Sequence, residues 1–167
     1  MYHAYVRAQV RRLFTAVNEG NSEPVLRLFA KRFEHFFPGT HALGGCRTTI
    51  SAARQWYGRL FRLLPGIHFD LRDIWVSGGP WNTIVVVEWD EANSGTDGVR
   101  TTNRGIHALH LRWGRATRLL IWPDTVPLEA TLDRLAASGN AEARAAPIGD
   151  EPQRFEVPIA RAFDMLR

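Results

Sequence analysis

Apolar residues recur along the chain with two different periods, and these periods predict the elements of the fold. In residues 4–18 they recur every three or four positions, which is typical of an amphipathic helix. The same spacing predicts three more helices, one beginning after Ser22, one from Thr48 or Thr49 to about Leu64, and one from about Pro127 to Gly139. β-Branched and aromatic runs predict strands at 33–37, 67–76, 82–90, 99–112 and 117–123.

The order of these elements predicts an α+β domain. Four consecutive strands with short connections favour antiparallel pairing, and helices segregated from the strands cover one face of such a sheet. We therefore expect a curved antiparallel or mixed sheet that wraps around the N-terminal helices as a cone open at one end. The expected domain spans residues 1–139, and residues 140–167 are expected to form a linker, over 140–153, and a C-terminal tail.

A hairpin between the last two strands places several polar side chains together. A turn at Gly114-Arg115 would give a two-residue loop, with His107 opposite Trp122 and Gly105 opposite Asp124. Directly opposed residues share a face of the sheet. The predicted register therefore gathers five residues on one face, Asn103, Gly105, His107, Trp122 and Asp124, and this set suggests a pocket.

Composition excludes several classes of function. The chain has 167 residues and a formal net charge of +4, but its basic residues are scattered and only Lys31 is a lysine, so nothing indicates a nucleic-acid-binding surface. Cys46 is the single cysteine, and the histidines have no metal-ligand spacing, so we expect neither a metal nor a cofactor. With no signal peptide and no membrane-spanning apolar run, we expect a cytoplasmic protein.

Short motifs give the chain a family resemblance. The FFPG segment at 36–39, the glycine-containing loop and capped helix after it, and a last strand ending in PDT resemble the SnoaL-like proteins of the nuclear transport factor 2 superfamily, over about residues 4–139. These proteins are relatives of ketosteroid isomerase and limonene epoxide hydrolase. The resemblance implies a cone with a hydrophobic small molecule inside it, and often a homodimer packed through the outer face of the sheet.

The same resemblance implies candidate catalytic residues. In the polyketide cyclases of the family, a carboxylate near the end of the last strand is the acid/base of an aldol ring closure, and Asp124 occupies the matching place. His107 occupies the position of a second polar pocket residue. The chain departs from the epoxide hydrolases, which use an arginine between two carboxylates, and from the isomerases, which keep a phenol that these strands lack.

Each candidate has a structural alternative. Asp124 is either a general base, with a pKa raised by an apolar pocket, or the N-cap of the helix near Pro127. His107 either assists proton transfer or is a core histidine with one hydrogen bond. Asn103 either binds the ligand or serves the adjoining loop. His35 either lies at the mouth of the pocket or is an exposed edge residue. The expected ligand-binding set is Asn103, His35, Phe37, Trp56, Tyr57, Trp89 and Trp122.

The sequence thus supports a small-molecule-binding SnoaL-like protein. As an enzyme it would be a cofactor-independent cyclase or isomerase that uses Asp124 with His107. The alternative is a non-catalytic ligand-binding protein, or a dimeric accessory protein of the same fold.

Overall fold

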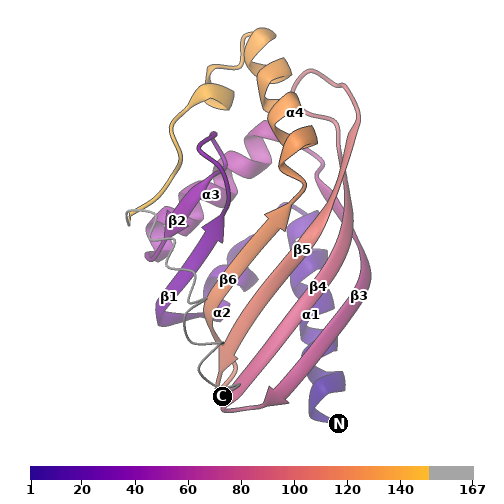
Figure 1. Cartoon of the computed structure of the whole chain (residues 1–167), viewed down its shortest axis with the longest axis vertical. Helices are drawn as coiled ribbons and strands as arrows, with labels where there is room; N and C mark the ends of the chain where they lie inside the picture. Colours follow the sequence, from indigo (N-terminus) through magenta and orange to yellow (C-terminus); the bar gives the residue numbers. More distant parts are fainter. Residues whose placement is uncertain (151–167) are drawn as a thin grey trace, which may run out of the picture.

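The computed structural model describes residues 1–150, which are organised by a six-stranded sheet (Figure 1). The helices are α1 (Tyr2–Asn18), α2 (Glu23–Leu28), α3 (Ile50–Leu63) and α4 (Thr125–Ala137), followed by the 3₁₀ helix η1 (Ala141–Arg144). The strands are β1 (Phe29–Phe37), β2 (Gly45–Arg47), β3 (His68–Gly79), β4 (Asn82–Asn93), β5 (Thr101–Arg112) and β6 (Arg115–Pro123). The predicted α+β class is confirmed, whereas β2 was expected to be part of a loop.

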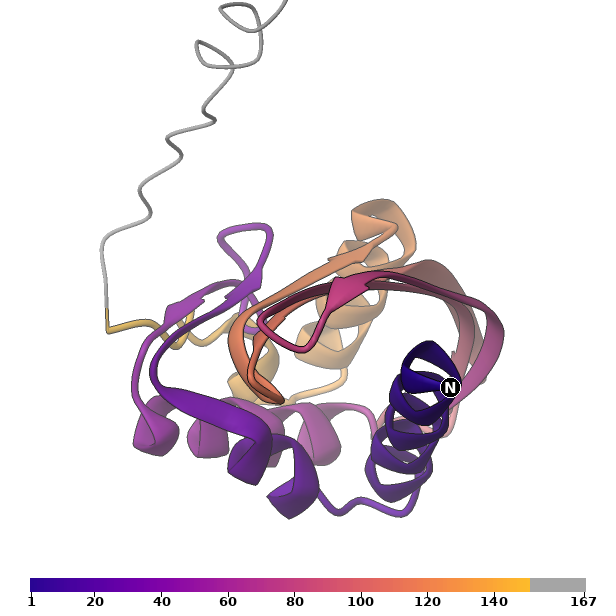
Figure 2. The ribbon, with the colours of Figure 1, turned by 90° about the horizontal axis from the view of Figure 1, so that it is seen from below.

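The sheet is mixed and strongly curved. Its strand order is β2-β1-β6-β5-β4-β3, and every neighbouring pair is antiparallel except β1 with β6. Seen from below, the sheet curves around α1 and α3, as predicted (Figure 2). The concave face is therefore buried against these helices, and the convex face is turned away from them.

Strict alternation along β4 separates the two faces. Every second residue of this strand is buried, namely Thr83, Val85, Val87, Trp89, Glu91 and Asn93. The residues between them, such as Ile84 and Glu88, are exposed or half-buried on the convex face. Because side chains alternate along a strand, this one buried series from β4 supplies the floor of the concave interior, apolar at its centre and polar at both ends.

Helix α1 covers the free edge of β3. The Asn18 amide donates to the carbonyl of Phe69 at 3.0 Å and accepts from its N–H at 2.8 Å, as a neighbouring strand would. The Arg7 Nε donates to the carbonyl of Ile74 at 3.0 Å. An edge strand exposes unpaired backbone groups. These side chains satisfy three of those groups and hold α1 across the open side of the cone.

The turn between β5 and β6 differs from the prediction. Arg112 pairs with Arg115, so the two loop residues are Trp113 and Gly114 rather than Gly114 and Arg115. Both have positive φ, 50° and 75° respectively, which is the conformation of a type I′ turn. The predicted turn was wrong because a bulky tryptophan occupies a left-handed position that usually favours glycine, asparagine or aspartate.

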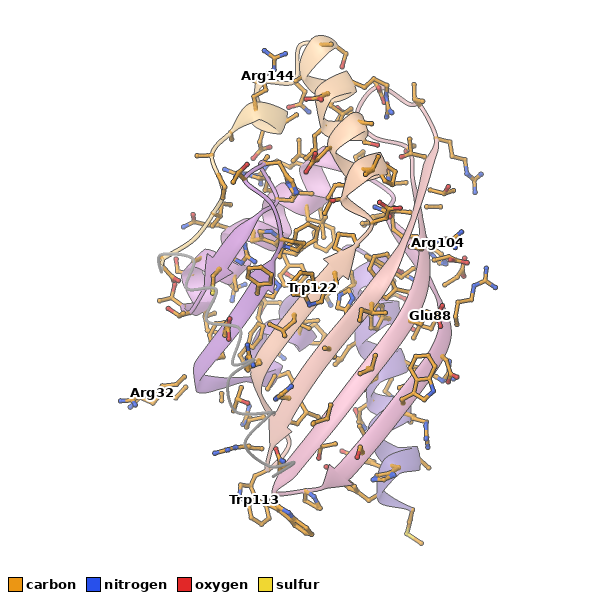
Figure 3. The ribbon with its side chains drawn as sticks, in the orientation of Figure 1. Arg32, Glu88, Arg104, Trp113, Trp122 and Arg144 are labelled. Atoms are coloured by element: carbon orange, nitrogen blue, oxygen red, sulfur yellow. The ribbon has the colours of Figure 1, made fainter. Side chains whose placement is uncertain are left out.

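The predicted hairpin register was wrong by one residue. After an irregularity between His110 and Leu111, His107 lies opposite Ile121, and Ile106 lies opposite Trp122. A shift of one residue moves side chains to the other face of a sheet. Trp122 therefore lies on the convex face, where 41% of it is exposed (Figure 3). His107 lies on the concave face, where it lines the cavity described below.

Residues 141–150 pack against the domain, in contrast to the linker expected over 140–153. The carboxylate of Asp150 accepts hydrogen bonds from the backbone N–H and the hydroxyl of both Thr48 and Thr49. Glu142 forms an ion pair with Arg62 at 2.6 Å. These contacts attach Asp150 to the start of α3 and Glu142 to the end of the same helix. The remainder of the expected linker and the tail lie outside the described residues.

Candidate functional site

An internal cavity lies between the concave face of the sheet, α1 and α3. Its lining is mostly aliphatic and aromatic. The side chains of the lining that carry polar atoms are Trp56, Tyr57, Trp89, Glu91, Asn103 and His107. Of the expected site residues, the structure brings together Phe37, Trp56, Tyr57, Trp89, Asn103 and His107 around this cavity, whereas Asp124, His35 and Trp122 are not among its lining.

The cavity is narrow, with a volume of about 70 Å³. An engineered apolar cavity of about 150 Å³ holds benzene. A ligand with even one ring would therefore displace lining side chains on binding, and changes of rotamer on that scale are common in binding sites.

Glu91 is the carboxylate of the cavity. Only 6% of Glu91 is exposed, and burial raises the pKa of its carboxyl to about 7. The amide of Asn93 donates to Glu91 at 2.8 Å and partly opposes this rise. The Asn93 oxygen accepts from the backbone N–H of Gly95 and from the hydroxyl of Thr101, which fixes the orientation of the amide. Near neutral pH, Glu91 can therefore both accept and release a proton.

His107 offers one defined hydrogen-bond donor. The indole Nε1–H of Trp89 donates to His107 Nδ1 at 2.6 Å. An indole nitrogen can only donate, so Nδ1 is unprotonated and the ring proton is on Nε2. Burial lowers the pKa of His107 to about 3, so the ring stays neutral at physiological pH. Phe14 packs edge-on against it at 5.0 Å between centroids.

Gly105 makes room for the Trp89 side chain. It lies opposite Trp89 in the β4–β5 pair. A Cβ on Gly105 would come within 2.7 Å of Trp89 Cζ2 and 2.4 Å of the Trp122 carbonyl. The glycine gap expected at this position therefore holds the indole that fixes His107, rather than a ligand.

Glu91 and Asn103 mark the mouth of the cavity. They lie opposite each other on β4 and β5, and both also border an outer groove that includes Asp90, Arg104 and Asp124. The Asn103 amide donates to the carbonyl of Asp124 at 3.0 Å, and its oxygen accepts from the N–H of Arg104 at 2.7 Å. Asn103 therefore serves the adjoining loop, the structural alternative raised for it.

The structure does not bring Asp124 and His107 together on one face. Asp124 is exposed at the outer groove, where its carboxylate accepts from the N–H of Val126 at 3.1 Å. It is the N-cap of α4. This arrangement matches the capping alternative. The prediction that Asp124 and His107 share a face was wrong because the register of β6 against β5 is shifted by one residue from the predicted one.

His35 lies away from the mouth where it was expected. It is fully buried beneath α3, opposite Arg47 in the β1–β2 pair. Tyr57 stacks on its ring at 5.6 Å between centroids, and Trp56 meets it edge-on at 4.8 Å.

Sequence reasoning missed Glu91 although a signal for it was present. The strand was expected to end at residue 90, so the alternation that turns Trp89 inward was not extended to Glu91. In the structure, β4 runs to Asn93. Glu88, another carboxylate of this strand, lies on the convex face (Figure 3).

Two negative findings apply to residues 1–150. No group of three or more His, Cys, Asp or Glu side chains there is arranged to hold a metal ion. No helix in that part of the chain combines the length and apolar character needed to cross a membrane.

The raised pKa of Glu91 predicts an unusual dependence of stability on pH. The folded state keeps a proton that the unfolded state releases between pH 4.5 and pH 7. The free energy of unfolding therefore falls as pH rises through this window, by about 3 kcal/mol. Glu91→Gln imitates the protonated form. We expect it to match the wild type near pH 4.5 and to exceed its stability by about 3 kcal/mol above pH 7, as measured by urea denaturation.

Comparing the wild type with Glu91→Gln at each pH cancels the contributions of all other titrating groups to the free energy of unfolding. Burial of neutral His107 gives the opposite slope, because stability is lost as pH falls below 6.5, and this contribution is common to both proteins. Glu88→Gln, on the convex face of the same strand, is the matched control and should not show this gain in stability above pH 7. A Glu91→Gln difference that is constant with pH would contradict the assignment.

Comparisons with known proteins identify the fold and the family. The chain is similar to the structure of TerC co-crystallised with polyporic acid, with 20% identity over 75% of this chain and 96% of that chain and a TM-score of 0.65. It is similar to an NTF2-like protein of unknown function from Burkholderia pseudomallei K96243, with 17% identity over 75% and 95% of the two chains and a TM-score of 0.67. A putative SnoaL-like polyketide cyclase from Jannaschia sp. CCS1 shows 16% identity over 74% and 88% and a TM-score of 0.58.

These structural similarities show the NTF2-like fold. No curated protein matches the chain. The model of the SnoaL-like domain matches residues 10–119, which include the second half of α1, strands β1 to β5 and most of the cavity lining. The chain therefore belongs to the SnoaL-like domain family.

Proposed function

We propose that this protein binds a small hydrophobic carbonyl compound in its cavity and catalyses a proton transfer next to the carbonyl group without a cofactor. The observation that carries this proposal is Glu91, a buried carboxylate whose pKa is about 7 in a mostly apolar cavity. A general base is most effective when its pKa lies near the working pH. The proposal moves the acid/base role from Asp124, which caps α4, to Glu91.

His107 has the complementary role in this proposal. When Glu91 removes a proton from the carbon beside the carbonyl, negative charge develops on the carbonyl oxygen. The neutral His107 can stabilise that oxygen by a hydrogen bond from Nε2–H, because Trp89 occupies the other ring nitrogen. A neutral imidazole is suited to polarising a carbonyl in this way. The hydroxyl of Tyr57, from α3, is a second donor on the same cavity.

Two outcomes are open to the resulting enolate. If protonated Glu91 returns the proton to a different carbon, the reaction is an isomerisation. If the enolate carbon attacks a second carbonyl of the same molecule, a ring closes in an aldol reaction, and the new alkoxide takes the proton from Glu91. Two structural neighbours support ligands of this kind, since TerC was co-crystallised with polyporic acid and another is named a putative SnoaL-like polyketide cyclase.

Hydrogen exchange into a simple carbon acid tests the proposal without knowledge of the natural substrate. In deuterated buffer, the wild type should accelerate exchange beside the carbonyl of 2-indanone, as followed by proton NMR. Glu91→Gln should lower this acceleration by about 10²- to 10⁴-fold, the usual contribution of a general base. The wild-type rate should rise with pH through about 7, because Glu91 must be ionised to act.

Glu88→Gln again provides the control on the opposite face of β4. Exchange that is equally fast in the wild type and in Glu91→Gln would refute the catalytic role of Glu91. Binding of 2-indanone with no acceleration of exchange in the wild type would instead indicate the alternative, a non-catalytic ligand-binding protein.

We also propose that the protein is a homodimer packed through the convex face of the sheet. One row of exposed or half-buried apolar residues crosses four strands there, formed by Trp75, Val86, Ala108 and Leu120. Trp122 and Ile106 extend this row and are 41% and 39% exposed. A contiguous exposed apolar patch marks an interaction surface. Glu88 and the Arg118–Glu34 ion pair border the patch (Glu88 is labelled in Figure 3), so charged side chains would form the rim of the interface.

Sedimentation velocity tests the dimer. The wild type should sediment as a dimer, and Trp122→Glu should shift it to a monomer because the introduced charge would be buried in the interface. Trp113→Glu, at the exposed tip of the β5–β6 hairpin, is the control and should remain dimeric. A monomeric wild type would exclude this arrangement.

A further inference from the structure

Arg47 is a fully buried cation at the edge of the sheet. It lies on β2 directly opposite His35 of β1, and both side chains are 0% exposed. Its Nε donates to His35 Nδ1 at 2.8 Å, and its Nη1 donates to the carbonyls of Gly44 and Ile148, each at 3.0 Å. All of these acceptors are neutral, so none of them compensates the charge of the guanidinium.

No carboxylate in residues 1–150 forms an ion pair with Arg47. Asp150 is near enough to influence it electrostatically, but its two oxygens already accept four hydrogen bonds from Thr48 and Thr49. Burial lowers the pKa of Arg47 only to about 10, so the side chain remains charged at neutral pH. A buried charge without a counter-ion is strongly unfavourable.

Two N–H donors at this place have no partner. Arg47 Nη2 and His35 Nε2 are both buried without a hydrogen bond. Because His35 Nδ1 accepts from Arg47, the proton of the neutral ring is on Nε2. Both unsatisfied atoms therefore need an acceptor. Buried groups of this kind are almost always satisfied in native proteins, by protein atoms, water or a ligand.

The Arg47–His35 pair lies behind one wall of the cavity. Trp56 and Tyr57 of α3 line that wall. Tyr57 stacks on His35, and the guanidinium carbon of Arg47 lies 5.2 Å from the centroid of the Trp56 ring. Trp56 and Tyr57 thus separate the two unsatisfied donors from the cavity. The cavity itself is too small for a one-ring ligand unless side chains move.

We infer that Arg47 and His35 form an anion subsite of the cavity, which binds the carboxylate or another oxyanion of a hydrophobic ligand when the Tyr57 side chain moves aside. An oxyanion supplies the counter-charge that Arg47 lacks and the acceptors that both donors need. The ligand would then extend from this subsite toward Glu91. The inference rests on the proposed function only in that the cavity takes a ligand, and it is independent of whether Glu91 transfers a proton.

Binding of paired probes to the full chain tests the subsite. The probes are propionate, isobutyrate and benzoate, each compared with its own uncharged amide, with affinities measured by NMR titration at neutral pH. We expect at least one acid to bind about 10- to 100-fold more tightly than its amide, because charged hydrogen bonds to Arg47 discriminate between them. Arg47→Met should abolish this preference, and Arg47→Lys should retain part of it.

The controls separate binding from structure. Arg59 donates to the carbonyl of Ala146 in the same C-terminal segment and to the carbonyl of Ala42 in the loop before β2. Arg59→Met should therefore weaken the attachment of the segment and leave the preference for the acid unchanged. If Arg47→Met does not fold, the affinities of the acid and its amide for the wild type still show whether the cavity prefers an anion. Equal binding of acids and amides, or binding of neither, would overturn the subsite and leave buried water as the partner of these donors. Hydrogen exchange into 2-indanone would be unaffected by that result.

Discussion

The hydrogen bond from the Trp89 indole to His107 determines what the centre of the cavity can do. An indole N–H has no acceptor capacity, so it fixes the tautomer of the imidazole and leaves Nε2–H as the only polar group that His107 can offer. The surrounding rings of Phe14 and Phe69 keep the imidazole neutral because they exclude water from it. Gly105 is part of the same arrangement, since a side chain there would displace the indole.

The same apolar surroundings act on Glu91 with the opposite sign. Burial disfavours the charged form of both groups, so it lowers the pKa of the histidine and raises that of the carboxyl. At neutral pH the cavity therefore holds a neutral donor and a carboxyl near its midpoint. Arg47 lies behind the wall formed by Trp56 and Tyr57, where it is the one fully buried cation among residues 1–150. The cavity is thus electrostatically asymmetric, with its carboxylate at the mouth and its positive charge beneath α3.

The sequence predicted the elements of this fold well because most of them bury one face. Helical spacing in residues 4–18 and the β-branched run of β4 correspond directly to elements that pack together. Trp89, expected in the pocket, lines the cavity. These signals are local in the sequence, so they can be recognised without any knowledge of the tertiary structure.

The errors concern features that local pattern does not determine. The β5–β6 register depended on Trp113 adopting a positive φ and on an irregularity near His110, and neither has a signature in the sequence. Strand β2 has three residues and is formed by pairing with β1, so Arg47 was not recognised as an interior residue. Glu91 was missed for a smaller reason, because β4 continues three residues beyond its predicted end at residue 90.

The most direct test of this account is an NMR titration of isotope-labelled protein that follows the carboxyl carbon of Glu91 and the ring nitrogens of His107 together. The account predicts that Glu91 titrates near pH 7 while His107 keeps its Nε2–H tautomer, and that Trp89→Phe releases this tautomer preference. A Glu91 midpoint near 4.5, or a His107 ring that protonates near 6.5, would contradict it.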